Sequence, residues 1–430
     1  MQFRRLSNKH RNTILLAGLI AASTANAQGL EFDGNLKYQL VNTTYPAGSL
    51  IRDLTDKNVA DHAATARFNI AYKSSKWAAT ASYQAIGLAG DTVELTSGST
   101  AGQAGLIRSP LLSDQTQLFD LTSTVDDGNR YALAHRLDRL TISYQGSKNV
   151  IRVGRQAVSW GNGLIYTPMD FFNPFDPTTI DTEYKPGADM LYAQHLLDSG
   201  NDLQWVSVFR RNESGRTSAS VNSHAIKYHG FFSSAEYDLL LAEHFDDTII
   251  AVGGSTSLGG SVVRGDWVIT DTEQDTFHSL VANISYSWVW RGKNMTGSLE
   301  YFHNDFGEQT DQLALTDLAA NPALANRVAR GELFTLGRDY LAGSATIEIN
   351  PLWNLTPNLF VNLTDNSAFS QLISQHSLSD NLQLIGAVSL PIGPRGTEFG
   401  GLPTGPLATS APRRFSNSSW SLFGQLAWYF

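Results

Sequence analysis

The chain has 430 residues and carries 31 Lys and Arg against 40 Asp and Glu, a formal net charge of −9. This acidic balance argues against nucleic acid as a partner. The chain has no cysteine, which excludes a disulfide framework, cysteine metal sites and a cysteine nucleophile.

The first 27 residues predict a secretory signal peptide. A short apolar run at 14–22 is followed by Ala25-Asn26-Ala27, which reads as a small-x-small cleavage site. The run is too short for a membrane helix, which needs roughly 20 apolar residues. Four basic residues precede the run: Arg4, Arg5, Lys9 and Arg11. Cleavage after Ala27 would remove these four and no acidic residue, which leaves 27 basic against 40 acidic residues and a net charge of −13.

From residue 30 onward, apolar and polar side chains alternate with a period of two, which is the pattern of β-strands with one apolar and one polar face. Several segments reach the ~9 to 11 residues that a tilted strand needs to cross a bilayer. We expect eighteen strands, with sixteen as the alternative count, at 30–42, 62–73, 76–87, 130–145, 149–158, 186–197, 201–211, 221–232, 235–244, 247–257, 261–270, 277–290, 294–305, 336–350, 353–364, 367–376, 381–391 and 418–430.

The connections between these strands fall into two classes. Tight turns such as Ser74-Ser75 follow the even-numbered strands. The long connections all follow odd-numbered strands, at 43–61, 88–129, 159–185, 306–335 and 392–417. A β-sandwich has no reason to sort its loops in this way, whereas a membrane barrel has short turns at one end and long loops at the other. The pattern therefore predicts an all-β fold: one transmembrane antiparallel up-and-down β-barrel over 28–430, closed because lipid forbids an open sheet edge, with short periplasmic turns and long extracellular loops.

Charged residues that alternate with apolar neighbours are expected to line the lumen. The basic candidates are Arg67, Arg139, Arg152, Arg155, Arg210 and Lys227. The acidic candidates are Glu236, Asp238, Glu300 and Glu348. Because the basic residues come from earlier strands than the acidic ones, one wall would be basic and the facing wall acidic, and the field between them would orient charged or dipolar solutes. The alternative is that these charges pair with one another and only keep the lumen wet.

Arg155 needs an additional assumption. Strict alternation would point it toward lipid, together with Ile151 and Val153. A β-bulge at Gly154 would return Arg155 to the lumen, and we expect that bulge.

The segment 159–185 interrupts the strand pattern after the fifth strand. Its prolines exclude regular sheet, and its aromatic rings need something apolar to pack against. We expect it to fold inward from the extracellular side and to constrict the lumen, with Asp170 and Asp176 near Arg152 and Arg155. The alternative is an ordered cap that contacts no solute. The candidate constriction residues are Trp160, Asp170, Phe171, Phe172, Phe175 and Asp176.

The last eleven residues alternate strictly and end on an aromatic carboxyl terminus, Trp428-Tyr429-Phe430. This strand resembles the final strand of porin-like outer-membrane β-barrels of Gram-negative bacteria. The resemblance implies that Trp428 and Phe430 form a signal for the barrel-assembly machinery, and that outer-membrane lipid surrounds the protein. The run Val153-Gly-Arg-Gln-Ala-Val-Ser-Trp-Gly161 also resembles a segment of alginate-export-type eighteen-strand barrels, which implies a lumen-lining arginine at Arg155.

These observations favour a passive porin-like channel for small polar or charged solutes, with no cofactor, no metal site and no catalytic residue. A conduit for polysaccharides or oligosaccharides is the alternative, although an anionic polymer would call for a more basic lumen. An outer-membrane enzyme ranks third, because no spacing among the ten histidines defines a triad or a metal site. A homo-oligomer stays open.

Overall fold

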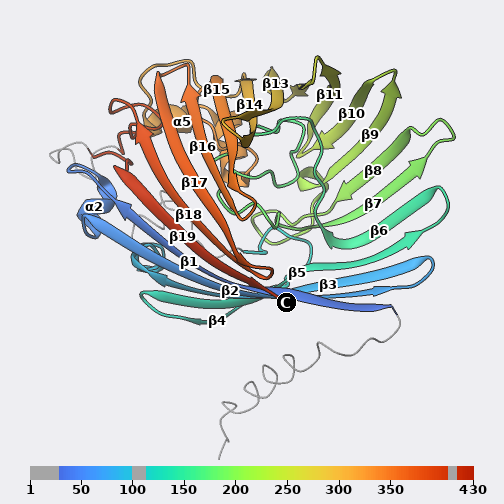
Figure 1. The fold of residues 1–430 in the computed structure, drawn as a ribbon, viewed down its shortest axis with the longest axis horizontal. Helices are drawn as coiled ribbons and strands as arrows, with labels where there is room; N and C mark the ends of the chain where they lie inside the picture. Colours follow the sequence, from blue (N-terminus) through green and yellow to red (C-terminus); the bar gives the residue numbers. More distant parts are fainter. Residues whose placement is uncertain (1–28, 99–112, 405–413) are drawn as a thin grey trace, which may run out of the picture.

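The computed structural model describes residues 29–98, 113–404 and 414–430, so the expected signal peptide at 1–27 lies outside the described residues. Eighteen strands form a closed antiparallel barrel (Figure 1), in which β1 pairs with both β2 and β19. The expected barrel and its count of eighteen strands are confirmed, with one further strand, β4, beside β5. Each expected strand end lies within four residues of the observed one.

The strands are β1 (Leu30–Thr44), β2 (Asn58–Lys73), β3 (Trp77–Gly90), β4 (Thr122–Asp127), β5 (Tyr131–Gln145), β6 (Asn149–Gln156), β7 (Ala188–Leu196), β8 (Asp202–Val208), β9 (Ser223–Phe232), β10 (Ala235–His244), β11 (Asp247–Leu258), β12 (Ser261–Asp271), β13 (Thr276–Trp290), β14 (Lys293–Asn304), β15 (Asp339–Asn350), β16 (Trp353–Asn362), β17 (Ser367–Ser379), β18 (Leu382–Ile392) and β19 (Trp420–Tyr429). The described helices are short: α2 (Leu50–Leu54), α3 (Asp91–Gly98), η2 (Ala219–Val221), α5 (Leu315–Ala320) and α6 (Pro322–Arg330). None of the helices in these ranges is long and apolar enough to span a membrane.

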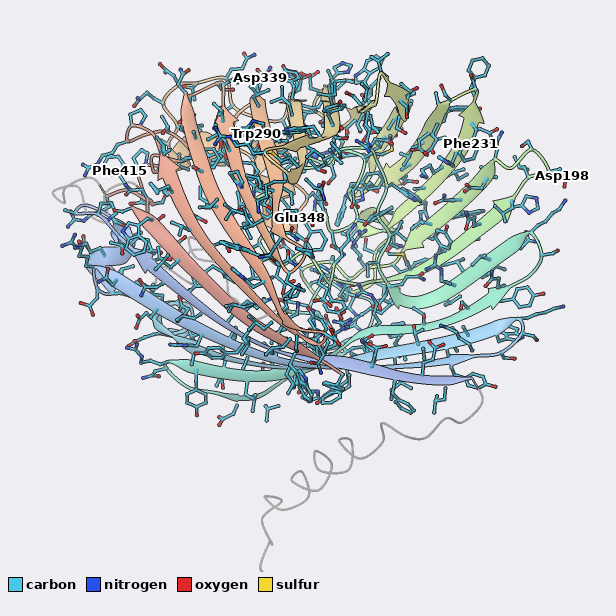
Figure 2. All side chains as sticks on the ribbon, in the orientation of Figure 1. Asp198, Phe231, Trp290, Asp339, Glu348 and Phe415 are labelled. Carbon is cyan, nitrogen blue, oxygen red and sulfur yellow. The ribbon has the colours of Figure 1, made fainter. Side chains whose placement is uncertain are left out.

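The barrel is apolar outside and polar inside, and its side chains project from both faces of the strands (Figure 2). In β1, Leu36 and Leu40 are exposed, whereas Asn35 and Lys37, on either side of Leu36, are buried. This reverses the arrangement of a water-soluble protein and matches a wall with lipid on its outer face. We call the end with the long connections the outer end.

The C-terminal strand closes the barrel against β1. The backbone of Phe430 exchanges hydrogen bonds of 3.0 and 3.1 Å with Gly34. The side chains of Trp428 and Phe430 are exposed. Their role as an assembly signal stays a prediction.

The parity of the strands shifts in β5 and not in β6. Asp138 has no partner in β3, because the register moves between Ser82 and Tyr83, and it turns inward beside Arg139. The expected extra-residue bulge at Gly154 is wrong, since β6 pairs with β5 and β7 without a register shift. Gly154 has a φ of +122°, a backbone conformation that suits glycine, and the neighbouring Arg155 is buried.

Three neighbouring strands are short. β6, β7 and β8 have 8, 9 and 7 residues, near or below the ~9 to 11 that cross a bilayer. β4 pairs with the outer half of β5, beyond the point where β6 has ended. Residues 113–121 precede β4 in the chain and reach the end of β8, where Gln117 forms an isolated bridge with Arg210. The expected loop 88–129 therefore contributes part of the wall.

Candidate functional site in the lumen

The segment 159–185, which we call the inner segment, connects β6 to β7 and runs inside the ring of strands (Figure 1). Its first limb, residues 160–166, contacts inward-facing side chains of β8 and β12–β14. Its second limb, residues 178–185, contacts those of β17, β19, β1 and β2. The segment thus bonds to wall residues on widely separated strands.

Acidic wall residues hold the first limb. Glu300 has no exposed surface and accepts hydrogen bonds from three successive backbone N–H groups, those of Leu164, Ile165 and Tyr166, at 2.7, 3.0 and 2.6 Å. Asp266 in β12 accepts from the backbone and side chain of Asn162 at 2.6 and 2.7 Å. These charge-assisted bonds bind the chain itself, so neither carboxylate is free for a solute.

The aromatic rings of the inner segment pack between that segment and the wall. Trp160 donates to Gln204 in β8 at 2.8 Å, and Phe171 and Phe172 pack on each other and on His244 of β10. All three rings are buried. Tyr166 stacks on Phe302, with 4.8 Å between ring centroids, and packs against the tilted ring of Tyr340 at 5.6 Å. Phe175 lines a cavity of about 30 Å³ together with Pro168, Pro174, Pro177 and Phe334.

Two of the three aspartates of the inner segment, Asp170 and Asp176, bond close to the segment's own chain. Lys185 Nζ lies 2.6 Å from both carboxylate oxygens of Asp170 and 2.6 Å from the carbonyl oxygen of Val158, so the two ends of the segment are clasped together. Asp176 accepts from the backbone and hydroxyl of Thr178 in a local turn. The expected proximity of Asp170 and Asp176 to Arg152 and Arg155 is not found: among the described residues, Arg155 bonds to Asp189 and Asp114, and Arg152 lies over the Tyr192 ring.

The second limb lies against a basic part of the wall. Lys37 Nζ in β1 is 2.6 Å from Asp181 Oδ2 and 2.7 Å from Glu183 Oε2. The guanidinium of Arg67 in β2 lies 3.9 Å from the centre of the Tyr184 ring. The limb is therefore held by charges of the sign opposite to those that hold the first limb.

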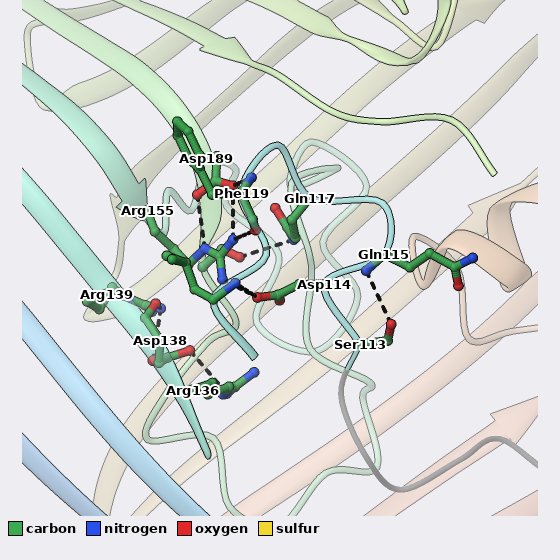
Figure 3. A network of polar contacts seen from close by, with 12 residues as sticks. Ser113, Asp114, Gln115, Gln117, Phe119, Arg136, Asp138, Arg139, Arg155 and Asp189 are labelled. Atoms are coloured by element: carbon green, nitrogen blue, oxygen red, sulfur yellow. Dashed lines mark hydrogen bonds and ion pairs between the residues drawn. The ribbon is translucent and has the colours of Figure 1, made fainter. Parts of the chain in front are cut away.

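Arg155 is built into the wall (Figure 3). Its guanidinium donates to Asp189 at 2.9 Å, to Asp114 at 2.6 Å and to the backbone oxygen of Phe119 at 2.6 Å. The residue is 3% exposed. Asp189 also accepts from the backbone N–H of Phe119. Arg155 and Asp189 thus form hydrogen bonds with backbone groups of 113–121 that have no neighbouring strand to pair with. Arg155 therefore holds residues 113–121 against the outer ends of β6 to β8.

The other sequence-predicted basic residues are mostly paired. Arg67 and Arg139 both bond to Asp138, at 2.6 and 3.0 Å. Arg136 joins them at 3.1 Å. Arg152 lies over the Tyr192 ring at 4.5 Å, and Lys227 Nζ is 2.9 Å from Asp238. A further residue, Arg210, lies beyond the end of β8 and donates to Ser223 at 2.6 Å.

The remaining acidic candidates lie near the end with the tight turns. Glu236 is exposed at the start of β10. Glu348 accepts from Asn294 at 2.9 Å near the end of β15. Of the ten predicted lumen charges, several thus bind each other or the inner segment, as the pairing alternative anticipates. Sequence reasoning missed Arg136, Asp138 and Asp266 as site residues, and the bulge at Asp138 left no signal in the alternation.

A buried chain of polar groups joins the outer ends of β9 and β10 to the loop after β14. Ser223 Oγ lies 2.7 Å from His244 Nδ1, and His244 Nε2 lies 2.9 Å from Glu332 Oε1. The chain has the order of a serine-hydrolase triad, but Ser223 has no exposed surface, and Arg210 donates to its hydroxyl. These bonds join β9, β10 and the loop at Glu332, and the His244 ring packs against Phe171.

No protein-family model and no curated protein sequence matches the chain. Among solved structures, the barrel is similar to OccAB3 of Acinetobacter baumannii, with a TM-score of 0.53 and 8% identity over 93% of this chain and 99% of that one. It is also similar to a BenF-like porin from Pseudomonas fluorescens Pf-5, with a TM-score of 0.53 and 10% identity over 94% and 99%. OccK5 (OpdH) of Pseudomonas aeruginosa matches with a TM-score of 0.51 and 10% identity over 93% and 98%. At these identities the comparison shows the fold: a closed barrel of the kind seen in outer-membrane porins.

Proposed function

We propose that the protein is a porin-like channel of the Gram-negative outer membrane, through which small polar or charged solutes diffuse passively. The inner segment carries the proposal, because it bonds to Glu300 on one wall and to Lys37 on another. Barrels of 16 to 18 strands enclose an aqueous channel unless the chain fills it. The inner segment, held across such a lumen, narrows the channel and determines the cross-section that is open to solutes.

The lining away from the inner segment supports passage of water-soluble solutes. Neutral polar side chains of β14 to β16 alternate with outward leucines such as Leu299 and Leu359 and so face the lumen. They are Thr296, Ser298, Ser344, Thr346 and Asn358. Hydroxyl and amide groups of this kind exchange hydrogen bonds with water and with polar solutes at similar free energy, so they retain neither.

The inner segment also bears on the alternatives. A polysaccharide conduit needs an unobstructed path for a polymer, whereas this lumen is crossed by a segment anchored on both sides. An enzyme needs a nucleophile that substrate can reach, and the Ser223 hydroxyl is buried. Both features favour the channel.

Planar-bilayer recording of the purified barrel tests the proposal. We expect discrete conductance steps in the folded wild-type protein and a larger step after deletion of 163–177, because the constriction is then lost. Deletion of 213–215, an exposed turn after β8, is the matched control and should leave the step unchanged. Folded preparations that give no conductance would refute the proposal.

A further inference from the structure

The second limb of the inner segment places two carboxylates over a buried cation. Asp181 and Glu183 both contact the ammonium of Lys37, whose side chain is 6% exposed, whereas Glu183 is 33% exposed. The carboxylates therefore lie between the ammonium and the open lumen. Burial alone would raise the pKa of Glu183, but hydrogen bonds from Lys37, Tyr184 and Tyr429 lower it, so this carboxylate is charged at neutral pH.

A second cation beside them has donor capacity that the protein does not use. Arg67 donates through Nε to Asn69 and through Nη2 to Asp138, at 3.2 and 2.6 Å. Its Nη1 is buried and has no hydrogen-bond partner among the residues that the structure describes. Tyr184 of the second limb covers this guanidinium at 3.9 Å. A buried charged donor without an acceptor is unfavourable, so an additional oxygen ligand here would be favourable.

The charge balance shows what the second limb contributes. Four cations of this part of the wall contact either the second limb or Asp138. They are Lys37, Arg67, Arg136 and Arg139. On the wall itself the three arginines share one carboxylate, that of Asp138, so the four cations and this carboxylate together carry a net charge of +3. Asp181 and Glu183 reduce this to +1. Two carboxylates of the inner segment thus supply most of the counter-charge for this part of the wall.

We propose that Lys37 and Arg67 form an anion-binding site, that Asp181 and Glu183 fill its Lys37 end as an intramolecular substitute, and that a divalent oxyanion from solution displaces them. The proposal rests on the proposed channel function for its physiological meaning, but the site itself can be tested without transport. The second limb is the part suited to exchange, because its ion pairs are partly exposed, whereas the first limb binds a fully buried Glu300. Displacement would uncover the basic wall and make the lumen more attractive to anions.

Isothermal titration calorimetry of the detergent-folded barrel with sulfate measures the site directly. The double variant Asp181→Asn/Glu183→Gln keeps the shape of both side chains and removes their charge, so we expect it to bind sulfate at least tenfold more tightly than the wild type. Adding Lys37→Met to that variant should abolish the gain. The matched control, Glu236→Gln/Glu348→Gln, removes two carboxylates near the other end of the lumen and should bind sulfate like the wild type.

Reversal potentials under a KCl gradient provide the second readout. The double variant should raise the chloride-to-potassium permeability ratio at least threefold above that of the control variant. Equal sulfate affinity in the wild type and the folded double variant would overturn the proposal, as would a gain that survives Lys37→Met. If sulfate binds as expected but no protein conducts, the anion site stands and the channel function fails, so the two failures are distinguishable.

Discussion

Glu300→Gln is the substitution that most directly tests how the inner segment is held. The change is isosteric, but it replaces one acceptor oxygen by an NH₂ group that faces the backbone N–H of Leu164 and the amide of Asn283. Two bonds to Oε1, from Ile165 and Tyr166, become neutral, which costs about 1 kcal/mol each, and at least one buried donor loses its acceptor at about 1–3 kcal/mol. The sum is about 3–5 kcal/mol, or two to three and a half powers of ten in the ratio of docked to undocked first limb.

Amide hydrogen exchange of the folded barrel measures this ratio at residues 164–166. We expect protection of these amides to fall by at least a factor of about one hundred, while the ladder of β14 keeps its protection, because the segment undocks without unfolding the barrel. Glu348→Gln is the control, since Glu348 bonds to Asn294 and not to the segment. Unchanged protection at 164–166 in the Gln variant would refute the view that Glu300 holds the limb.

Three further predictions concern the wall and the outer end. Gly154→Ala places a Cβ 2.0 Å from the carbonyl oxygen of Leu140, so it should reduce the yield of folded barrel, measured by its heat-dependent shift on a gel. Gly200 also has a positive φ but has open space around it, so Gly200→Ala should lower the free energy of unfolding in urea by only about 1–2 kcal/mol. Arg155→Lys keeps the charge but loses the planar fork that binds Asp189 and Asp114. Residues 113–121 should therefore become cleavable by chymotrypsin at Phe119 in the folded protein. Resistance equal to that of Arg216→Lys, an exposed control, would contradict the assigned role. Burial raises the pKa of Glu398 to about 7, above its ordinary 4.5. The free energy by which its loop docks is therefore fully present below pH ~4.5 and falls as the pH rises through 7. Amide hydrogen exchange at 395–401 should be faster at pH 8.5 than at pH 5, after correction for intrinsic rates, and Glu398→Gln should remove the difference.

The strands could be predicted because a barrel wall imposes one physical condition on every residue: alternate side chains meet lipid and water. Leu36 and Lys37 show this condition directly in the sequence, and so do the tight turns between strands. β4 escaped because its sequence, Thr-Ser-Thr-Val-Asp-Asp, has no apolar face. It pairs at the outer rim, where lipid no longer selects for alternation.

The site was harder to predict because its contacts join residues that are far apart in the chain. Glu300 was expected to face the lumen, and it does, but its partners lie more than 130 positions away in the inner segment. Asp138 breaks the parity on which the inward assignment depended, and its bulge has no glycine or proline to announce it. Alternation predicts the direction of a side chain, but only the closed barrel shows which charges neutralise one another.

The clasp between Lys185 and Asp170 makes the inner segment a replaceable part. Because Lys185 Nζ also reaches the carbonyl oxygen of Val158, the chain enters and leaves the lumen through one narrow neck, and the ladder between β6 and β7 is complete without the residues in between. Closing a loop of different length at such a neck changes the entropic cost only slowly with length. The barrel is thus a scaffold in which the content of the lumen can be exchanged, by evolution or by design, while the wall is left as it is.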